Sequence, residues 1–210
     1  MMELGKNAIL RWLESYARDL ETNKEYLTQL DGAIGDNDHG INMDRGFRKV
    51  MEVLPAERDK PMADILKAVG MTLIRTVGGA AGPLYGTVFL RMAQAAGGKE
   101  ALTAEDLGAV LEAGRKGIVD RGKAEPDDKT MLDTWQPAVQ AYREATSEGK
   151  DLQAAVQAAA EAAERGMQAT TPLVARKGRA SYLGERSRGH QDPGATSSYL
   201  LFKSLAATLM

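Results

Sequence analysis

Apolar residues recur every three or four positions along most of the chain, which is the period of amphipathic α-helices. The first such pattern predicts a helix over about residues 4–20, and a short second helix follows around Leu27. A third helix is expected to stop at Pro55, because proline interrupts helices. Pro61 suits the first helical position of a fourth helix.

Glycine pairs and capping residues mark the ends of the following helices. Gly78-Gly79 and Gly97-Gly98 should end the fourth and fifth helices, because glycine favours helix C-termini. Thr103 and Asp106 have the spacing of a capping box at the start of a sixth. Further helical patterns run from about Leu132, from Asp151 to about Thr170, and from Pro193 to near the C-terminus.

These patterns predict about eight or nine helices and no convincing strand, so the expected fold class is all-α. Short connections favour antiparallel neighbours. We therefore expect a closed barrel or bundle of about eight antiparallel amphipathic helices in one domain spanning residues 1–210. Residues 175–194 are the exception, because this long polar stretch has no helical period. Loops of that length are usually functional or disordered.

Composition narrows the class of protein. The chain has 27 Lys+Arg and 29 Asp+Glu, a net charge of −2, which argues against chain-wide binding to nucleic acid. It has no cysteine, which excludes disulfides, thiolate metal sites and cysteine nucleophiles. The longest uncharged stretch, between Arg75 and Arg91, is too short to span a membrane, and the charged N-terminus is unlike a secretory signal. We expect a soluble cytoplasmic protein that binds no membrane.

The sharpest chemical feature is the run DGAIGDNDHG, in which Asp31, Asp36 and Asp38 are interleaved with glycines. Glycines let the backbone turn so that the carboxylates converge, and converged carboxylates repel each other unless a cation lies among them. An EF-hand loop starting at Asp36 fails, because it would place Ile41 at the required glycine and Phe47 at the required glutamate. The pattern suits Mg²⁺ bridged to a phosphate ligand. The alternative is a solvated polar turn whose aspartates cap helices.

Two further stretches have features of phosphate-binding segments. The run GGAAGP at residues 78–83 places backbone N–H groups before a helix start, where phosphate can bind; a plain helix–helix turn is the alternative. The basic stretch 175–194 can form a lid that screens phosphates, and an exposed loop is the alternative. Its five positive charges are those of Arg176, Lys177, Arg179, Arg186 and Arg188. Together with the acidic run, these segments suggest a Mg²⁺–nucleotide or another phosphate ligand.

Four strings carry a family resemblance: LDGAIGDNDHGINMDRGF, TVGGAAGPLYGT, RGKAEPDDKTMLD and ARKGRASYLGERSRGHQDPGATS. They resemble the nucleotide-binding L subunits of bacterial dihydroxyacetone kinases, and the resemblance runs from about Trp12 to the C-terminal helix. It implies a closed helical barrel with the nucleotide at one end. It also implies that Asp31, Asp36 and Asp38 coordinate a pair of Mg²⁺ ions bridging the diphosphate of bound ADP or ATP.

The same resemblance assigns nucleotide contacts to the matching positions. They are His39, Gly40, Ile41, Asn42, Ala80, Ala81, Gly122, Met131, Arg179, Asp192, Pro193 and Gly194. The family usually has serine where this chain has Ala81. One side-chain donor to phosphate is therefore missing, and backbone N–H groups would have to serve in its place.

As a free-standing L subunit, the chain resembles the type that depends on the phosphotransferase system. The resemblance then implies that ADP is a retained coenzyme, which a phosphohistidine on the M subunit of that system phosphorylates to ATP. The L subunit passes the γ-phosphoryl group to dihydroxyacetone held on the K subunit, so neither His39 nor His190 is expected to carry phosphate.

Two alternatives stay open at this point. One is the nucleotide subunit of an ATP-dependent or tetrulose kinase, and the other is a nucleotide-bearing partner of a transcription regulator. The sequence also leaves open the ketose, the phosphoryl donor, the contents of the barrel interior and the oligomeric state, a homodimer included.

Overall fold

The computed structural model describes residues 3–209, and these are mostly helical. A 3₁₀ segment, η1 (Arg179–Ser187), lies between the last two α-helices. The predicted all-α class is confirmed. Within the described residues the α-helices are α1 (Lys6–Thr22), α2 (Lys24–Ile34), α3 (His39–Glu57), α4 (Met62–Thr76), α5 (Ala81–Ala96), α6 (Ala104–Gly122), α7 (Leu132–Ser147), α8 (Leu152–Ala169) and α9 (Pro193–Leu209).

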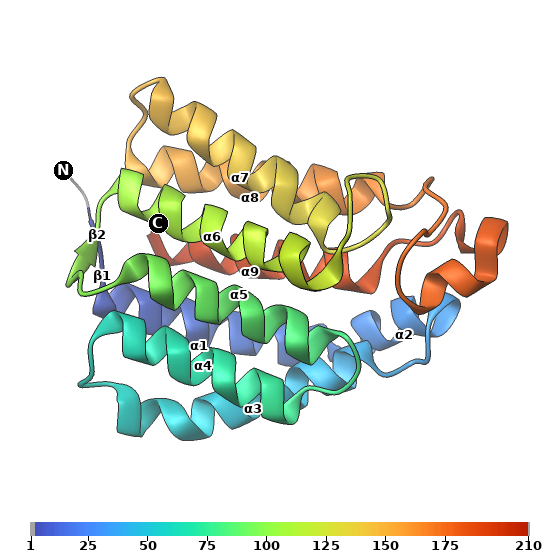
Figure 1. Ribbon diagram of the computed structural model, residues 1–210, viewed down its shortest axis with the longest axis horizontal. Coiled ribbons are helices and arrows are strands. Elements are labelled where there is room, and N and C mark those ends of the chain that lie inside the picture. The colour runs from blue at the N-terminus through green and yellow to red at the C-terminus, as the bar shows by residue number, and fades with distance from the viewer. Residues whose placement is uncertain (1–2, 210) are drawn as a thin grey trace.

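The long helices lie side by side, and α2 packs on α3 at one end of the bundle (Figure 1). Helix α1 contacts both α3 and α9. The other neighbours follow chain order, from α3 through α4, α5, α6, α7 and α8 to α9. This sequence of neighbours returns to its starting helix.

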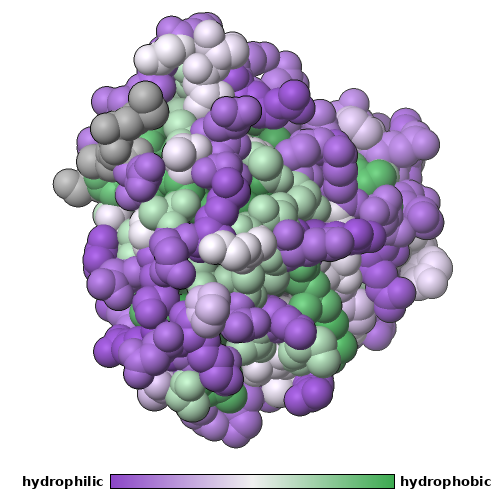
Figure 2. All heavy atoms as spheres, turned by 60° about the vertical axis from the view of Figure 1, so that its left-hand side comes forward, coloured by the Kyte–Doolittle hydropathy of each residue, from purple (hydrophilic) through white to green (hydrophobic). Residues whose placement is uncertain are grey.

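Large apolar side chains fill the space between the helices. Tyr16 packs edge-on against Phe47 with ring centroids 4.6 Å apart, and Trp135 packs in the same way against Phe202 at 4.8 Å. All four rings are almost fully buried, as the apolar face of each amphipathic helix predicts. Hydrophilic side chains cover most of the face shown in Figure 2, with apolar ones in a broken band between them.

Two short strands lie where the sequence analysis found no convincing strand. Strand β1 (Leu4–Gly5) pairs antiparallel with β2 (Ala101–Leu102), so α1 begins at Lys6 rather than near residue 4. Each strand has two residues, too few for the alternating pattern by which strands are predicted.

Two helix boundaries differ from the prediction at prolines. Helix α3 continues past Pro55 to Glu57. Because Pro55 lies in the final turn, its missing N–H and its bulky ring disturb only the end of α3, and the buried Leu54 packs that turn against the core. Pro61 precedes α4 as its N-cap, and the first helical residue is Met62.

The predicted capping box at α6 is confirmed. The Thr103 hydroxyl accepts from the Asp106 N–H, and the Asp106 carboxylate accepts from the Thr103 N–H, both at 3.2 Å. No helix among residues 3–209 is both long and apolar enough to cross a membrane.

One end of the bundle collects the segments that the sequence analysis singled out. The α2–α3, α4–α5 and α6–α7 connections, together with the segment between α8 and α9, lie at the end opposite β1 and β2 (Figure 1). The helices therefore bring four stretches that are far apart in the sequence to one place.

Candidate functional site

A pocket of about 500 Å³ lies among these four segments. Its volume is in the range of small-molecule sites. The structure brings most of the predicted site residues to its wall. They are Asp31, Asp36, Asp38, His39, Asn42, Ala80, Ala81, Gly122, Met131, Arg179, Asp192, Pro193 and Gly194.

Three carboxylates converge at this wall. Asp31 belongs to the last turn of α2, and Asp36 and Asp38 lie in the connection to α3. One oxygen from each side chain lies within 4.8 Å of the others. Asp31 Oδ2 accepts the backbone N–H groups of Asp38 (2.8 Å) and His39 (3.1 Å), which fixes its carboxylate. A Cβ on Gly35 would lie 2.1 Å from Asp31 Oδ1, so glycine leaves this carboxylate its space. We call these three aspartates the acidic cluster; an all-oxygen donor set of this kind fits a hard divalent cation.

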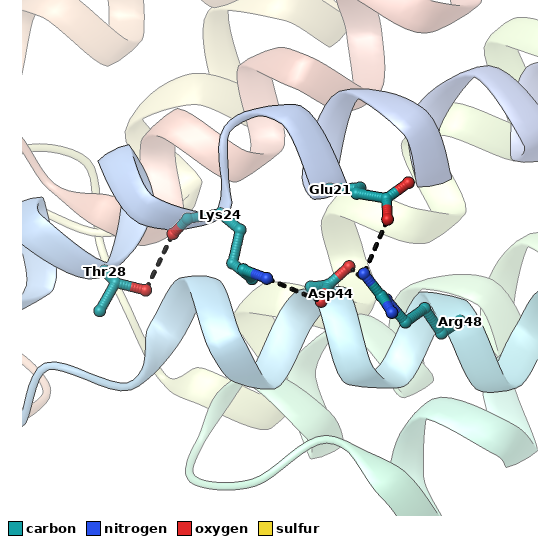
Figure 3. Close-up of polar contacts among 5 residues, drawn as sticks. All are labelled: Glu21, Lys24, Thr28, Asp44 and Arg48. Atoms are coloured by element: carbon teal, nitrogen blue, oxygen red, sulfur yellow. Dashed lines mark hydrogen bonds and ion pairs between the residues drawn. The ribbon is translucent and has the colours of Figure 1, made fainter.

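A charged network holds α2 against α3 (Figure 3). The buried Asp44 carboxylate accepts from Arg48 Nε (3.0 Å) and lies 3.8 Å from Lys24 Nζ on α2. Arg48 also donates to Glu21 in the last turn of α1 (2.7 Å), and the Thr28 hydroxyl donates to the Lys24 carbonyl (2.8 Å). The network therefore connects the two helices whose ends carry the acidic side chains.

Residues 171–191, which we call the lid segment, reach over the pocket. Arg179 Nη2 lies 3.0 Å from Asp36 Oδ2, so this segment contacts the acidic cluster directly. A small apolar group formed by Ile34, Ala175 and Ala180, with Leu183 packed against it, seats the segment on the end of α2. The stretch predicted to lack helical structure therefore contains η1 and has its own apolar contacts.

The His39 side chain points toward α9. Its Nε2 lies 2.8 Å from the Ser197 hydroxyl, which lies 2.7 Å from the Tyr85 hydroxyl. Burial lowers the pKa of His39, although the neighbouring aspartates oppose this shift. The imidazole is thus fixed within a buried hydrogen-bonded group.

The glycine turn between α4 and α5 is tied to the start of α3. Gly79 has φ +63°, a left-handed conformation that favours glycine. Arg45 donates to the Thr76 carbonyl (3.1 Å) and to Asn42 Oδ1 (2.7 Å), so it connects the end of α4 with α3. Ala81 is the first residue of α5, where backbone N–H groups lack helical partners and can receive an anion.

Two of the predicted nucleotide contacts are not on the pocket wall. Gly40 is buried where α3 crosses α2, and a Cβ there would lie 2.0 Å from the Lys24 carbonyl oxygen. Ile41 is 48% exposed and lines a separate surface hollow with Lys24 and Arg45. Successive helical residues point about 100° apart, so the run from His39 to Asn42 cannot face one pocket throughout.

Sequence reasoning missed part of the wall. Lys129 lines the pocket with its side chain 1% exposed, although the sequence places it in a charged, hydrophilic run. Ile34, Leu84 and Ile118 add an apolar surface. Their helical periodicity indicated only that they face inward, and it could not separate pocket lining from core.

Asp192 caps α9, because its carboxylate accepts the Ala195 N–H at 2.7 Å. Burial raises the pKa of Asp192 to about 7, and the charge of Asp133 contributes. The pKa of an aspartate in the unfolded chain is near 4, so between about pH 4 and pH 7 the folded state binds a proton at Asp192 that the unfolded state does not. The stability of the fold therefore falls as pH rises from about 4 to about 7. We expect Asp192→Asn, which keeps an acceptor for the cap, to reduce this loss by roughly 1–3 kcal/mol.

Urea unfolding at pH 5 and pH 8 measures this effect. Asp151→Asn is the matched control, because Asp151 also caps a helix, through the Ala154 N–H at 2.8 Å, but is exposed. An equal pH dependence in wild type and Asp192→Asn would contradict the role given to burial of Asp192.

Comparisons with known proteins show the family of the chain. The family model described as DAK2 domain matches residues 33–207. The chain is 51% identical over 205 residues to the PEP-dependent dihydroxyacetone kinase, ADP-binding subunit DhaL, of Escherichia coli, covering 98% of each chain. It is 46% identical to the corresponding subunit of dihydroxyacetone kinase 1 of Listeria innocua, covering 99% of this chain and 98% of that protein.

A solved structure shares the fold. The dihydroxyacetone kinase of C. freundii, in complex with AMP-PNP and Mg²⁺, superposes with a TM-score of 0.66 at 27% identity. The match covers 93% of this chain and 33% of that kinase, so the chain spans about a third of its length.

Proposed function

The chain belongs to the DAK2 domain family, and from that premise we propose that it is the ADP-binding subunit of a phosphoenolpyruvate-dependent dihydroxyacetone kinase. Bacterial subunits of that description match it over nearly their whole length. These relatives favour this function over an ATP-dependent kinase, a tetrulose kinase or a nucleotide-bearing regulator. The observation that carries the proposal is the convergence of three carboxylates at the wall of a nucleotide-sized pocket.

We assign a pair of Mg²⁺ ions to the acidic cluster, with Asp31, Asp36 and Asp38 as the protein ligands. The fit rests on two observations. Their oxygens lie within 4.8 Å of one another, and among the described residues Arg179 is the one cationic side chain that forms an ion pair with them. Bound Mg²⁺ would neutralise the diphosphate, and the nucleotide would carry the phosphoryl group.

The chain's own residues supply position and charge. Arg179, held on the lid segment, offers a planar guanidinium that can donate to phosphate oxygens once it leaves Asp36. Ala80 and Ala81 line the same pocket at the start of α5, where backbone N–H groups would have to stand in for the hydroxyl that serine would provide. The apolar side chains of Leu84 and Ile118 offer a surface for the base.

The partners follow from the proposed reaction. We propose a K subunit that holds dihydroxyacetone and an M subunit of the phosphotransferase system that supplies phosphate from its phosphohistidine. Since phosphoryl transfer depends mostly on positioning and charge neutralisation, both partners would have to reach the end of the bundle where the pocket lies.

Reconstitution tests the function. The purified chain is loaded with Mg²⁺–ADP and passed through gel filtration, and we expect the nucleotide to elute with the protein because it is a retained coenzyme. Addition of K and M subunits, phosphoenolpyruvate and dihydroxyacetone should then yield dihydroxyacetone phosphate. Nucleotide that washes out, together with activity supported by free ATP without the M subunit, would indicate an ATP-dependent kinase.

A further inference from the structure

The lid segment is closed at its base. It leaves the bundle after α8 and returns before α9, and residues 170–171 and 189–192, at its junctions with these helices, form its two stems. The Gly189 N–H donates to the Thr171 carbonyl (2.8 Å), and the Asp192 N–H donates to the Thr170 hydroxyl (3.0 Å). These bonds bring the two stems together.

Lys129 lies across this base. Its Nζ donates to the carbonyl oxygens of Thr170 (2.5 Å) and His190, one on each stem, and lies 3.4 Å from the Thr171 carbonyl. An ammonium has three donors and no acceptor, so the stems can satisfy it fully. Among the described residues no carboxylate pairs with Nζ within 4.0 Å, and the carbonyl groups of the two stems are its main partners.

Separation of the stems would leave this charge unpaired. Burial lowers the pKa of Lys129, the charges of Asp192 and Asp133 oppose that shift, and the charge of Arg188 adds to it. Burial by itself disfavours the ammonium, so the carbonyl oxygens of the two stems, which accept its N–H groups, are what stabilises it in the closed base. Lys129 also has a left-handed backbone, with φ +63°, in the loop between α6 and α7.

The outer part of the lid segment has weaker attachments. Arg179 and Asp36 form an ion pair in which the Arg179 side chain is 65% exposed, and exposed pairs contribute little. The apolar group around Ala180 is small. The buried base is therefore the firmest attachment of the segment that carries Arg179.

We propose that Lys129 is a positioning residue that holds both stems of the lid segment and thereby sets Arg179 and Asp192 against the pocket. The identity of the ligand rests on the proposed function, but the role of Lys129 in the lid segment does not.

The test compares Lys129→Met with Lys123→Met. Lys123 lies in the same loop with a left-handed backbone (φ +51°), but its side chain is exposed. Tyr182 is the only Phe, Trp or Tyr in residues 171–191 and is 88% exposed, so chymotrypsin cleavage after it reports opening of the segment. Without nucleotide we expect Lys129→Met to be cleaved there at least about 10-fold faster than wild type, and Lys123→Met within about 2-fold.

A milder variant keeps the buried charge. In the wild type, exposed Arg188 donates to the Pro172 carbonyl (3.0 Å) and so links the two ends of the lid segment. Arg188→Ala removes this bond, and we expect cleavage after Tyr182 about 3-fold faster than in wild type. Dissociation of a fluorescent ADP analogue with Mg²⁺ is a second readout, and it should be faster from Lys129→Met.

Several outcomes would overturn the proposal. One is an unchanged cleavage rate at Tyr182 in Lys129→Met. A second is that chymotrypsin cleaves the helices of Lys129→Met with the same acceleration as the lid segment. A third is that Lys129→Met loses its cooperative thermal transition. In either case Lys129 would support the whole bundle. Failure of the ADP analogue to bind wild type would contradict the proposed function and leave the cleavage result to decide the role of Lys129.

Discussion

Asp36→Asn is expected to lower the affinity for Mg²⁺–ADP by roughly 100-fold or more, so that the nucleotide no longer survives gel filtration. The substitution keeps the size of the side chain and removes one of three negative charges that converge within 4.8 Å. It also weakens the contact with Arg179, so the lid segment loses its attachment to the acidic cluster. Isothermal titration calorimetry measures the change.

Asp59→Asn is the matched control for this charge change. Asp59 is exposed in the turn between α3 and α4, which lies at the end of the bundle away from the pocket (Figure 1). Its variant should bind Mg²⁺–ADP as wild type does. Equal ADP and Mg²⁺ binding by Asp36→Asn and Asp59→Asn would refute the assignment of the acidic cluster.

Gly40→Ala is expected to destabilise the fold by about 2–3 kcal/mol and to weaken Mg²⁺–ADP binding as well. The added Cβ would lie 2.0 Å from the Lys24 carbonyl oxygen and 2.8 Å from the Thr28 N, both backbone atoms of α2. Backbone cannot swing aside, so the start of α3 must move away from α2. That movement would also displace Asp38 relative to Asp31.

Urea unfolding and calorimetry on Gly40→Ala test both effects. Gly98→Ala is the control, because nothing lies within 4 Å of a Cβ at Gly98. A Gly40→Ala protein as stable as Gly98→Ala, but with weaker nucleotide binding, would indicate a direct ligand contact at Gly40 instead of close helix packing.

The features that were predicted correctly depend on residues that are close together in the sequence. The all-α class follows from apolar residues at helical spacing, and the capping box at Thr103 follows from side chains that bond within four residues. The acidic cluster was also predicted, because Asp31, Asp36 and Asp38 are close along the chain and must converge wherever the glycines let it turn.

Features set by distant contacts could not be predicted in this way. Lys129 is buried because carbonyl groups 41 and 61 residues away surround its ammonium. Strand β1 exists because a segment about a hundred residues further along passes beside it. Ile41 belongs to the string that carries the family resemblance, but its position on α3 directs its side chain away from the pocket.

Crystals grown with Mn²⁺ and ADP, and measured for the anomalous signal of manganese, test whether the acidic cluster holds the metal. We expect manganese peaks coordinated by Asp31, Asp36 and Asp38, with the diphosphate bridging them and Arg179 turned toward it. Nucleotide in the pocket with no manganese at these three carboxylates would contradict it.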